Sequence, residues 1–168
     1  MNLNKLNPEC YEEFEHETVL TEEDNNVRYQ LKVRLKVSSK QGIYINLPLL
    51  KKLSKYLQAD YKIANPPKDC DAIIIDKDSN IAYLIEMKRS SNASTNERIN
   101  EQLSAGMKWL EHICFCTDTI SGDYRIIKVA VMIESSRRSR SRGQQEGTVI
   151  GYDFYRKTGN SLALEFIS

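Results

Sequence analysis

Two short apolar runs separated by a polar segment constrain the fold of this chain more than any other feature. The runs are 72–75 (Ala-Ile-Ile-Ile) and 81–85 (Ile-Ala-Tyr-Leu-Ile), and the segment 77–80 between them is Lys-Asp-Ser-Asn. Strand-forming runs joined by a short polar turn predict a β-hairpin. The second run is too apolar for a solvent-exposed edge strand, so we expect the hairpin to lie inside a larger sheet.

The segments around the hairpin predict both strands and helices. Residues 27–37 alternate apolar with polar or basic side chains, which is the pattern of a half-buried strand. Residues 47–58 have apolar side chains at helical spacing, with Asn46 as the N-cap. Residues 95–115 predict a long helix whose buried stripe consists of Ile99, Leu103, Met107, Leu110 and Cys114.

The remaining segments complete one α/β domain. Residues 124–133 predict a strand whose apolar second half is buried on both faces. The segments 148–155 and 161–167 predict a C-terminal hairpin, and a short strand near Tyr61 is a further candidate. The acidic stretch 8–24 predicts a short helix. We therefore expect a single domain in which helices flank a central mixed β-sheet, with an added N-terminal strand and C-terminal β-hairpin.

Composition limits the function classes without choosing among them. The chain has 168 residues, with 24 Lys and Arg against 23 Asp and Glu and a net charge of +1. Bulk charge thus argues neither for nor against a nucleic-acid partner. The sequence contains no apolar run long enough to cross a bilayer and does not start with a signal-peptide pattern. Its four cysteines have no zinc-ligand spacing, so we expect free thiols and a cytoplasmic location.

The open end of the predicted hairpin gathers two acids and a lysine. If Asp78 and Ser79 form the turn, the antiparallel register places Asp71 opposite Glu86. Opposed residues project from one face of a sheet, and Lys88, two residues further, shares that face. Two carboxylates this close favour a shared proton, a lysine or a hard divalent cation, and oxygen ligands suit Mg²⁺ or Mn²⁺. A slip of one residue in the register would separate the two carboxylates.

These residues resemble the motif of the PD-(D/E)XK nucleases, the restriction-endonuclease-like superfamily. The matching segments are 70–76 (CDAIIID) and 83–88 (YLIEMK), in which an acid opens one strand and an acid-x-lysine closes the next. The resemblance implies that Asp71 and Glu86 bind Mg²⁺ or Mn²⁺. It also implies that Lys88 assists the attack on a phosphodiester bond.

A second match lies in the predicted long helix. The sequence Glu-Gln-Leu at 101–103 resembles the glutamine motif of RecB-like members, which adds Gln102 to the catalytic candidates; an ordinary exposed helix residue is the alternative. The resemblance covers a core at 47–134, preceded by an N-terminal extension (1–46) and followed by a C-terminal basic loop and hairpin (135–168).

The sequence departs from the family pattern in two places. Pro67 precedes Asp71 by four residues instead of standing next to it, which makes Asp69 a competing first acid. Many members carry a glutamate on the helix before the core, but the predicted helix 47–58 contains no acid. Glu13 or Glu17 from the N-terminal segment are the candidates to replace it.

Two groups of basic residues are candidates for contacting a nucleic-acid backbone, because lysine and arginine donate hydrogen bonds to phosphate oxygens. The polar face of the strand 27–37 includes Lys32 and Arg34, and a polar loop contains Arg137, Arg138, Arg140 and Arg142. A solvated loop, and a charged strand that resists edge-to-edge association, explain the same residues without a ligand.

The leading hypothesis is a metal-dependent endonuclease that hydrolyses phosphodiester bonds, with DNA preferred over RNA as its substrate. A resolvase-like enzyme and a small defence or phage-borne nuclease both fit, and we expect a homodimer because duplex cleavage needs a site for each strand. Two alternatives stay open. One is a non-cleaving nucleic-acid-binding or accessory subunit with the same fold, and the other is an RNA-directed nuclease.

Overall fold

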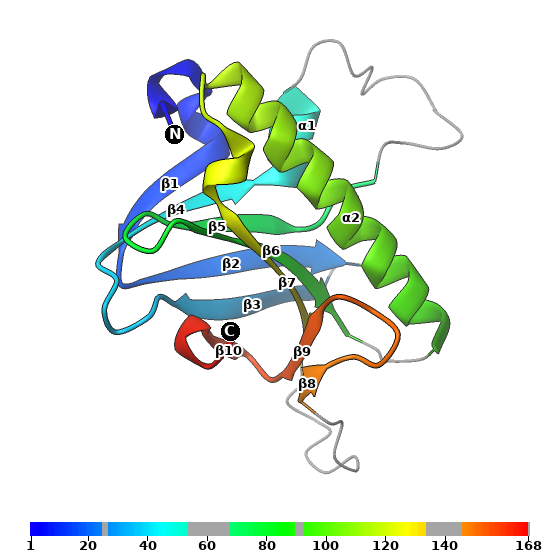
Figure 1. Cartoon of the computed structure of the whole chain (residues 1–168). Helices are drawn as coiled ribbons and strands as arrows, with labels where there is room; N and C mark the ends of the chain where they lie inside the picture. Colours follow the sequence, from blue (N-terminus) through cyan, green and yellow to red (C-terminus); the bar gives the residue numbers. More distant parts are fainter. Residues whose placement is uncertain (25–26, 54–67, 90–92, 134–145, 168) are drawn as a thin grey trace.

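The computed structural model describes residues 1–24, 27–53, 68–89, 93–133 and 146–167. These residues form three layers (Figure 1), in which a seven-stranded sheet carries the helices on one face and a three-stranded sheet on the other. The helices are α1 (Leu47–Leu53) and α2 (Ala93–Cys116). Within the described residues, neither is long and apolar enough to cross a membrane.

The large sheet is mixed, as the sequence predicts. Its order is β1-β4-β5-β6-β7-β9-β8; the pairs β6–β7 and β7–β9 are parallel and the others antiparallel. Strands β5 and β6 occupy its interior. The seven strands are β1 (Tyr11–Glu15), β4 (Gln41–Asn46), β5 (Ala72–Asp76), β6 (Ile81–Lys88), β7 (Arg125–Met132), β8 (Gly147–Thr148) and β9 (Tyr155–Thr158).

Side-chain hydrogen bonds at the turn hold the β5–β6 hairpin in register. Residues 72–76 pair with 81–85 in the register predicted from the turn position. The Asp76 carboxylate closes the turn by accepting hydrogen bonds from the backbone N–H groups of Asp78 and Ser79, at 3.1 and 3.2 Å. The hairpin prediction is therefore confirmed, and the register carries the end of β6 to the open end of the hairpin.

The second sheet consists of β2 (Glu17–Asp24), β3 (Val27–Arg34) and β10 (Ser161–Ala163). It overturns three predictions. The acidic stretch 8–24 forms strands β1 and β2 after a 3₁₀ turn, not a helix. The predicted pairing of 148–155 with 161–167 does not form, because β9 joins the large sheet beside β7 and β8 whereas β10 pairs in parallel with β3. Strands, and not helices, cover the face of the large sheet opposite α2.

Several element boundaries also differ from the prediction. The predicted strand 27–37 ends at Arg34, and Val37 beyond it is 87% exposed. Strand β4 was not predicted. The Asn46 cap is confirmed, because its side chain accepts from the Leu49 N–H at 2.9 Å; residues 54–58 of that helix, and the candidate strand near Tyr61, lie outside the described residues. Short 3₁₀ turns cover Leu3–Lys5, Pro8–Cys10, Ser121–Asp123 and Leu164–Phe166.

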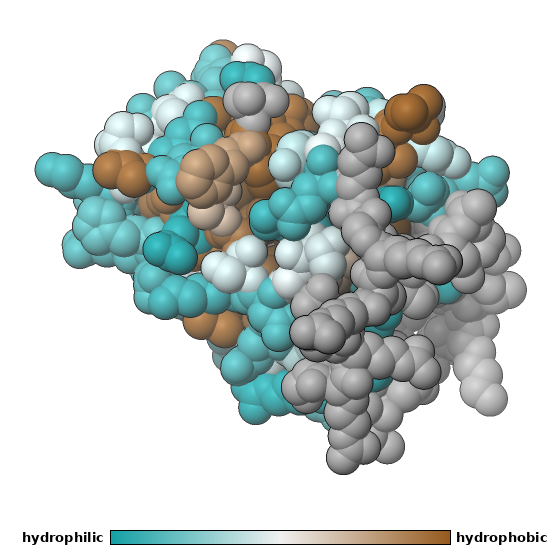
Figure 2. Space-filling model, turned by 90° about the horizontal axis from the view of Figure 1, so that it is seen from below, coloured by the Kyte–Doolittle hydropathy of each residue, from teal (hydrophilic) through white to brown (hydrophobic). Residues whose placement is uncertain are grey.

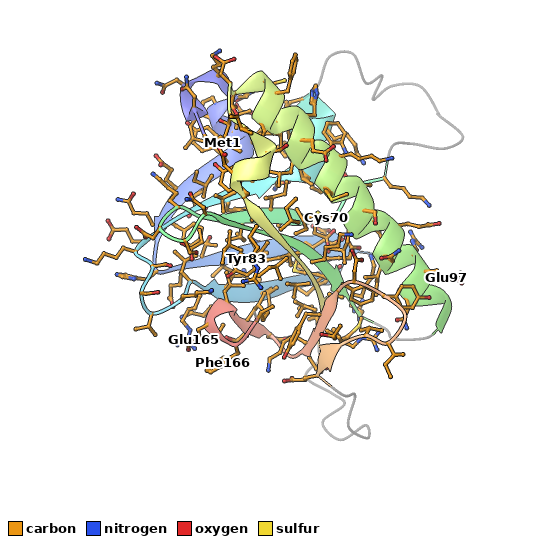
Figure 3. All side chains as sticks on the ribbon, in the orientation of Figure 1. Met1, Cys70, Tyr83, Glu97, Glu165 and Phe166 are labelled. Carbon is orange, nitrogen blue, oxygen red and sulfur yellow. The ribbon has the colours of Figure 1, made fainter. Side chains whose placement is uncertain are left out.

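Strands β5 and β6 contribute side chains to two separate cores. Tyr83 lies between the two sheets with Leu31, whereas Leu84 lies under the helices with Leu103. Figure 3 shows Tyr83 between the sheets and Cys70 beneath α2. Every residue of β5, and every residue of β6 before Lys88, is buried. The charged side chains of the two strands stand at or near their ends: Asp76 on β5, and Glu86 and Lys88 on β6.

Gly106 allows α2 to lie close against the start of β5. A Cβ atom at this position would stand 2.4 Å from the Sγ atom of Cys70 and 3.3 Å from its Cβ atom. The first contact is shorter than side-chain packing tolerates and the second is tight, and Cys70 is almost completely buried. The helix therefore needs glycine here to reach the sheet next to Asp71.

We predict that Gly106→Ala destabilises the fold by about 1–3 kcal/mol through overpacking, although alanine alone favours a helix by about 1 kcal/mol. Adding Cys70→Ala removes the Sγ atom and is expected to recover most of the loss in urea unfolding. Gly122→Ala is the control, because the atom nearest to its added Cβ is 3.9 Å away. Additive effects of the two core substitutions would contradict the proposed contact.

Candidate active site

Glu86 and Lys88 are the last two residues of β6 on the face of the sheet that the helices cover. Ala82 and Leu84 precede them on this face and pack under the helices. Glu86 has no exposed side-chain surface, and its Oε1 atom forms an ion pair with the ammonium group of Lys88, whose side chain is 21% exposed. The Glu86 Oε2 atom is buried and has no hydrogen-bond partner among the described residues. The end of β6 therefore presents a buried carboxylate with one oxygen free.

Asp71 lies beside this pair, but not in the regular ladder that the sequence predicts. Its N–H donates to the carbonyl of Ile85 at 3.0 Å, although Ile85 is already the register partner of Ala72. Cys70 packs under the helices whereas Ala72 packs between the sheets, which breaks strict alternation at Asp71. Two residues thus oppose one, which is the arrangement of a β-bulge. The predicted direct pairing of Asp71 with Glu86 is wrong in this respect.

The bulge nevertheless places the Asp71 carboxylate against the end of β6. Its Oδ2 atom accepts a hydrogen bond from the N–H of Met87 at 2.6 Å, and Met87 lies between Glu86 and Lys88 in the chain. Bulges redirect side chains at functional positions without ending the sheet. Two carboxyl groups and one ammonium group therefore meet at this end of the hairpin.

Burial and mutual repulsion raise the pKa values of both acids. Burial, followed by the charges of Glu86 and Glu22, holds the pKa of Asp71 well above its ordinary range. Burial raises the pKa of Glu86 to about 7, although Lys88 opposes the shift. Burial alone lowers the pKa of Lys88, but Glu86, Asp71 and Glu22 outweigh it, so its pKa is raised and it stays an ammonium ion. The cluster thus holds one positive charge against several acids.

Glu22 is the acid that the sequence analysis missed. It is the third inward-facing residue of β2 after Thr18 and Leu20, and its Oε2 atom is buried without a hydrogen-bond partner among the described residues. Its charge acts on Asp71 and on Glu86. The alternation of residues 18, 20 and 22 was the available signal, but the high density of acids in this segment favoured a helix.

The other acids that the sequence offered form ion pairs with lysines. Glu13 pairs with Lys77 at 3.1 Å beside the hairpin turn, and Glu17 pairs with Lys32 at 2.7 Å, so neither completes the site. Asp69, the competing first acid, is paired with Lys51 at 2.7 Å, although its charge also raises the pKa of Glu86. Asp71 therefore remains the acid that faces the end of β6.

Gln102 lies on the helix that covers this face of the sheet. It precedes Gly106 by one helical turn, and Gly106 stands against Cys70, so Gln102 shares the side of α2 that faces the hairpin end. Its side chain is half-buried, and its Oε1 atom has no hydrogen-bond partner among the described residues. The structure brings Gln102 to the layer above the acids, without a hydrogen bond to them.

The predicted basic residues are not brought to the acids. Lys32 and Arg34 are exposed on the outer face of β3. They stand near the end of the β2–β3 pair where Glu17 is opposite Arg34, whereas Glu22 lies five residues further along β2. The underside of the molecule (Figure 2) intersperses hydrophilic with hydrophobic side chains instead of forming one hydrophilic surface. The other four, Arg137, Arg138, Arg140 and Arg142, lie outside the described residues.

The donor atoms at the site fit a hard divalent cation. In the part of the chain that the structure describes, no group of three or more His, Cys, Asp and Glu side chains is arranged as a complete metal site. Mg²⁺ does not require one, because it commonly binds through one or two carboxylates and completes its shell with water and phosphate oxygens. The free Oε2 atom of Glu86 and the neighbouring Asp71 carboxylate supply oxygen ligands of this kind.

No family model, curated protein or solved structure gives a significant match to this chain. The likeness to the PD-(D/E)XK nucleases therefore rests on the motif residues themselves and on the arrangement that brings Asp71, Glu86 and Lys88 together.

We predict that the metal-free protein loses stability as the pH rises toward 7. The folded state keeps a proton on Glu86 up to about pH 7, whereas an unfolded glutamate loses its proton near its ordinary pKa of 4.5. The free energy of unfolding then falls across this window, by up to about 3 kcal/mol. Urea unfolding in EDTA at pH 5, 6, 7 and 8 measures the slope, and Glu86→Gln is expected to flatten it.

Glu23→Gln is the matched control for this experiment, because Glu23 is exposed on the outer face of β2. This variant should keep the wild-type pH dependence. An equal slope in wild type and Glu86→Gln would mean that Glu86 is not the group that retains the proton.

Proposed function

We propose that this protein is a metal-dependent endonuclease that hydrolyses phosphodiester bonds, with DNA as the preferred substrate. The observation that carries the proposal is the buried carboxylate of Glu86, which has one oxygen without a partner and lies beside Asp71 and Lys88. A fold that buries acids with too little positive charge gains nothing in stability from them. Acids of this kind are typical of sites that bind a cation during catalysis.

Asp71 and Glu86 are the residues that would hold Mg²⁺ or Mn²⁺. A bound ion of this type lowers the pKa of a water molecule and neutralises charge on a phosphoryl oxygen. Glu22 adds a third negative charge, and the low exposure of these side chains excludes much of the competing water. In the metal-free protein the pKa of Glu86 is about 7, so this carboxyl group is partly protonated near neutral pH and cation binding must displace its proton.

Lys88 has the role of a charged hydrogen-bond donor. Because the surrounding acids keep its pKa raised, its Nζ atom carries a proton at neutral pH and does not serve as a general base. The ammonium group is partly exposed at the end of β6. From there it orients the attacking water or stabilises the negative charge that develops on the phosphoryl oxygens. The water oxygen forms the new bond to phosphorus and gives up a proton, while the bond from phosphorus to the leaving ester oxygen breaks and that oxygen takes up a proton.

Three further features belong to this proposal. A homodimer would supply one site for each strand of a duplex. A cytoplasmic location is consistent with the four cysteines, all of which are free. Gln102 is proposed to support the site from α2, because its free Oε1 atom is on the side of the helix that faces the hairpin end.

The direct test is incubation of the protein with supercoiled plasmid, a four-way junction and single-stranded RNA, each with Mn²⁺ or with EDTA. We expect metal-dependent cleavage of DNA, reduced on the order of 100-fold or more by Glu86→Gln and by Asp71→Asn, since each substitution removes a proposed metal ligand. Glu23→Gln, at an exposed position, should retain full activity. Activity that survives Glu86→Gln would exclude this site as its source. Binding without cleavage would favour the accessory-subunit alternative.

The contribution of Glu22 is tested by metal binding instead of turnover. Replacing Glu22 by Gln removes a negative charge that acts on Asp71 and Glu86, so Mn²⁺ affinity at pH 8 should fall about tenfold. Isothermal titration with Mn²⁺ measures this, with Glu23→Gln as the neighbouring control. Equal affinities for the two variants would remove Glu22 from the site.

A further inference from the structure

Arg156 stands in the same row of the sheet as Glu86, two strands away. In the parallel ladders, Glu86 pairs with Ala130 and Ala130 pairs with Arg156. Ala130 and Phe154 both pack under the helices, so alternation along β9 places Arg156 on that face as well. A hydrogen bond from the Arg156 guanidinium to the Oδ1 atom of Asn96 on α2 supports this orientation.

The guanidinium group has an incomplete set of partners. Its Nε atom is buried without a hydrogen-bond acceptor, and among the described residues no carboxylate forms an ion pair with Arg156. The neutral amide of Asn96 orients the group but does not balance its charge. A half-buried arginine without an anionic partner is costly unless an anion binds to it.

A second polar group next to Arg156 is also without a partner. Thr158 pairs with Met132, which pairs with Lys88, so Thr158 lies one row further along the same face. Its Oγ1 atom is buried without a hydrogen-bond partner in the described part of the chain. A hydroxyl and a guanidinium on one strand, both with unused donors, form a set that matches the oxygens of a phosphate group.

The distance between Glu86 and Arg156 explains why these two opposite charges do not form an ion pair with each other. Two strand spacings separate the backbones of Glu86 and Arg156 by about 10 Å. Ala130 stands between them in the same row, and it is buried in the core under the helices. A group that reaches both charged side chains must be bound by a cation on the acid side and be negative on the arginine side. A phosphodiester bound through a divalent cation has both properties.

We propose that Arg156, oriented by Asn96 and assisted by the Thr158 hydroxyl, binds the non-bridging oxygens of the phosphodiester that reacts at Asp71 and Glu86. This inference rests on the proposed nuclease function, and it adds a substrate-binding group from β9, outside the motif that suggested that function. The planar guanidinium suits two phosphate oxygens at once, which a lysine does not match. Asn96 is a positioning residue, because it acts on the substrate only through Arg156.

The test measures binding without turnover. A fluorescent single-stranded DNA of twelve nucleotides is titrated with protein in EDTA and in Ca²⁺, with anisotropy as the readout. Arg156→Gln is expected to weaken binding in Ca²⁺ by about 10- to 100-fold, because hydrogen bonds to a charged group are lost. Arg156→Lys should fall between this variant and wild type. Asn96→Ala should weaken binding less than Arg156→Gln, and its effect should vanish when Arg156 is already replaced.

Arg125→Gln is the matched control, because Arg125 is exposed on β7 at the turn end of the hairpin, where it pairs with Ile81. It removes the same charge far from the acids, and its affinity should change less than about twofold. Equal losses for Arg125→Gln and Arg156→Gln would overturn the proposal, because they would show a general charge effect. A fall in melting temperature for Arg156→Gln with unchanged DNA affinity would also overturn it, by showing a structural role.

The outcomes separate this inference from the proposed function. Metal-dependent cleavage by wild type, with DNA affinity unaffected by Arg156→Lys and Arg156→Gln, would refute only the role of Arg156. Binding that depends on Arg156 without any cleavage would refute the nuclease function and retain the phosphate site. If Arg156→Gln fails to fold, Arg156→Lys and Asn96→Ala, which keep most of the local packing, decide the question through the same titration.

Discussion

The burial of the Glu86 carboxylate is the constraint on which the site depends. A buried acid is tolerated only when a proton, a cation or several hydrogen bonds compensate for the lost water. Lys88 compensates in part, but Asp71 and Glu22 add negative charge to the same region. Under the proposed function, protons balance the cluster when no metal is present and a cation balances it when one is bound. Such a site favours binding over stability.

Packing rather than polar bonding creates this burial. Strands β5 and β6 are apolar on both faces, since one face meets the helices and the other meets the small sheet. Gly106 lets α2 approach Cys70 closely, so that the helix covers the region just before the hairpin begins. The small sheet brings Glu22 to the same region from the opposite side. The acids are thus enclosed by all three layers of the fold, and they gain their raised pKa values from elements far apart in the sequence.

Local patterns predicted the parts of this site that depend on local rules. The turn and the two apolar runs specify the hairpin register, and with it the placement of Glu86 and Lys88 on one face. The bulge at Asp71 was not predictable, because it depends on how Cys70 packs against α2. Glu22 was missed because the many acids in its segment favoured the prediction of a helix over that of a strand. The route of the C-terminal strands was missed, since pairing of β10 with β3 is a long-range contact.

Opposite charges occupy the two sides of the site, with acids on one side and an arginine on the other. On the α2 face, acids stand on the β5–β6 side, and Arg156, which has no ion-pair partner among the described residues, stands on β9, with alanine in the row between them. If the fold needed these charges only for stability, the shortest solution would be an ion pair between them, which the intervening strand prevents. A ligand with a cation at one end and an anion at the other resolves both imbalances at once. The arrangement of opposite charges held apart on rigid strands therefore favours a phosphate-bearing substrate over a purely structural role.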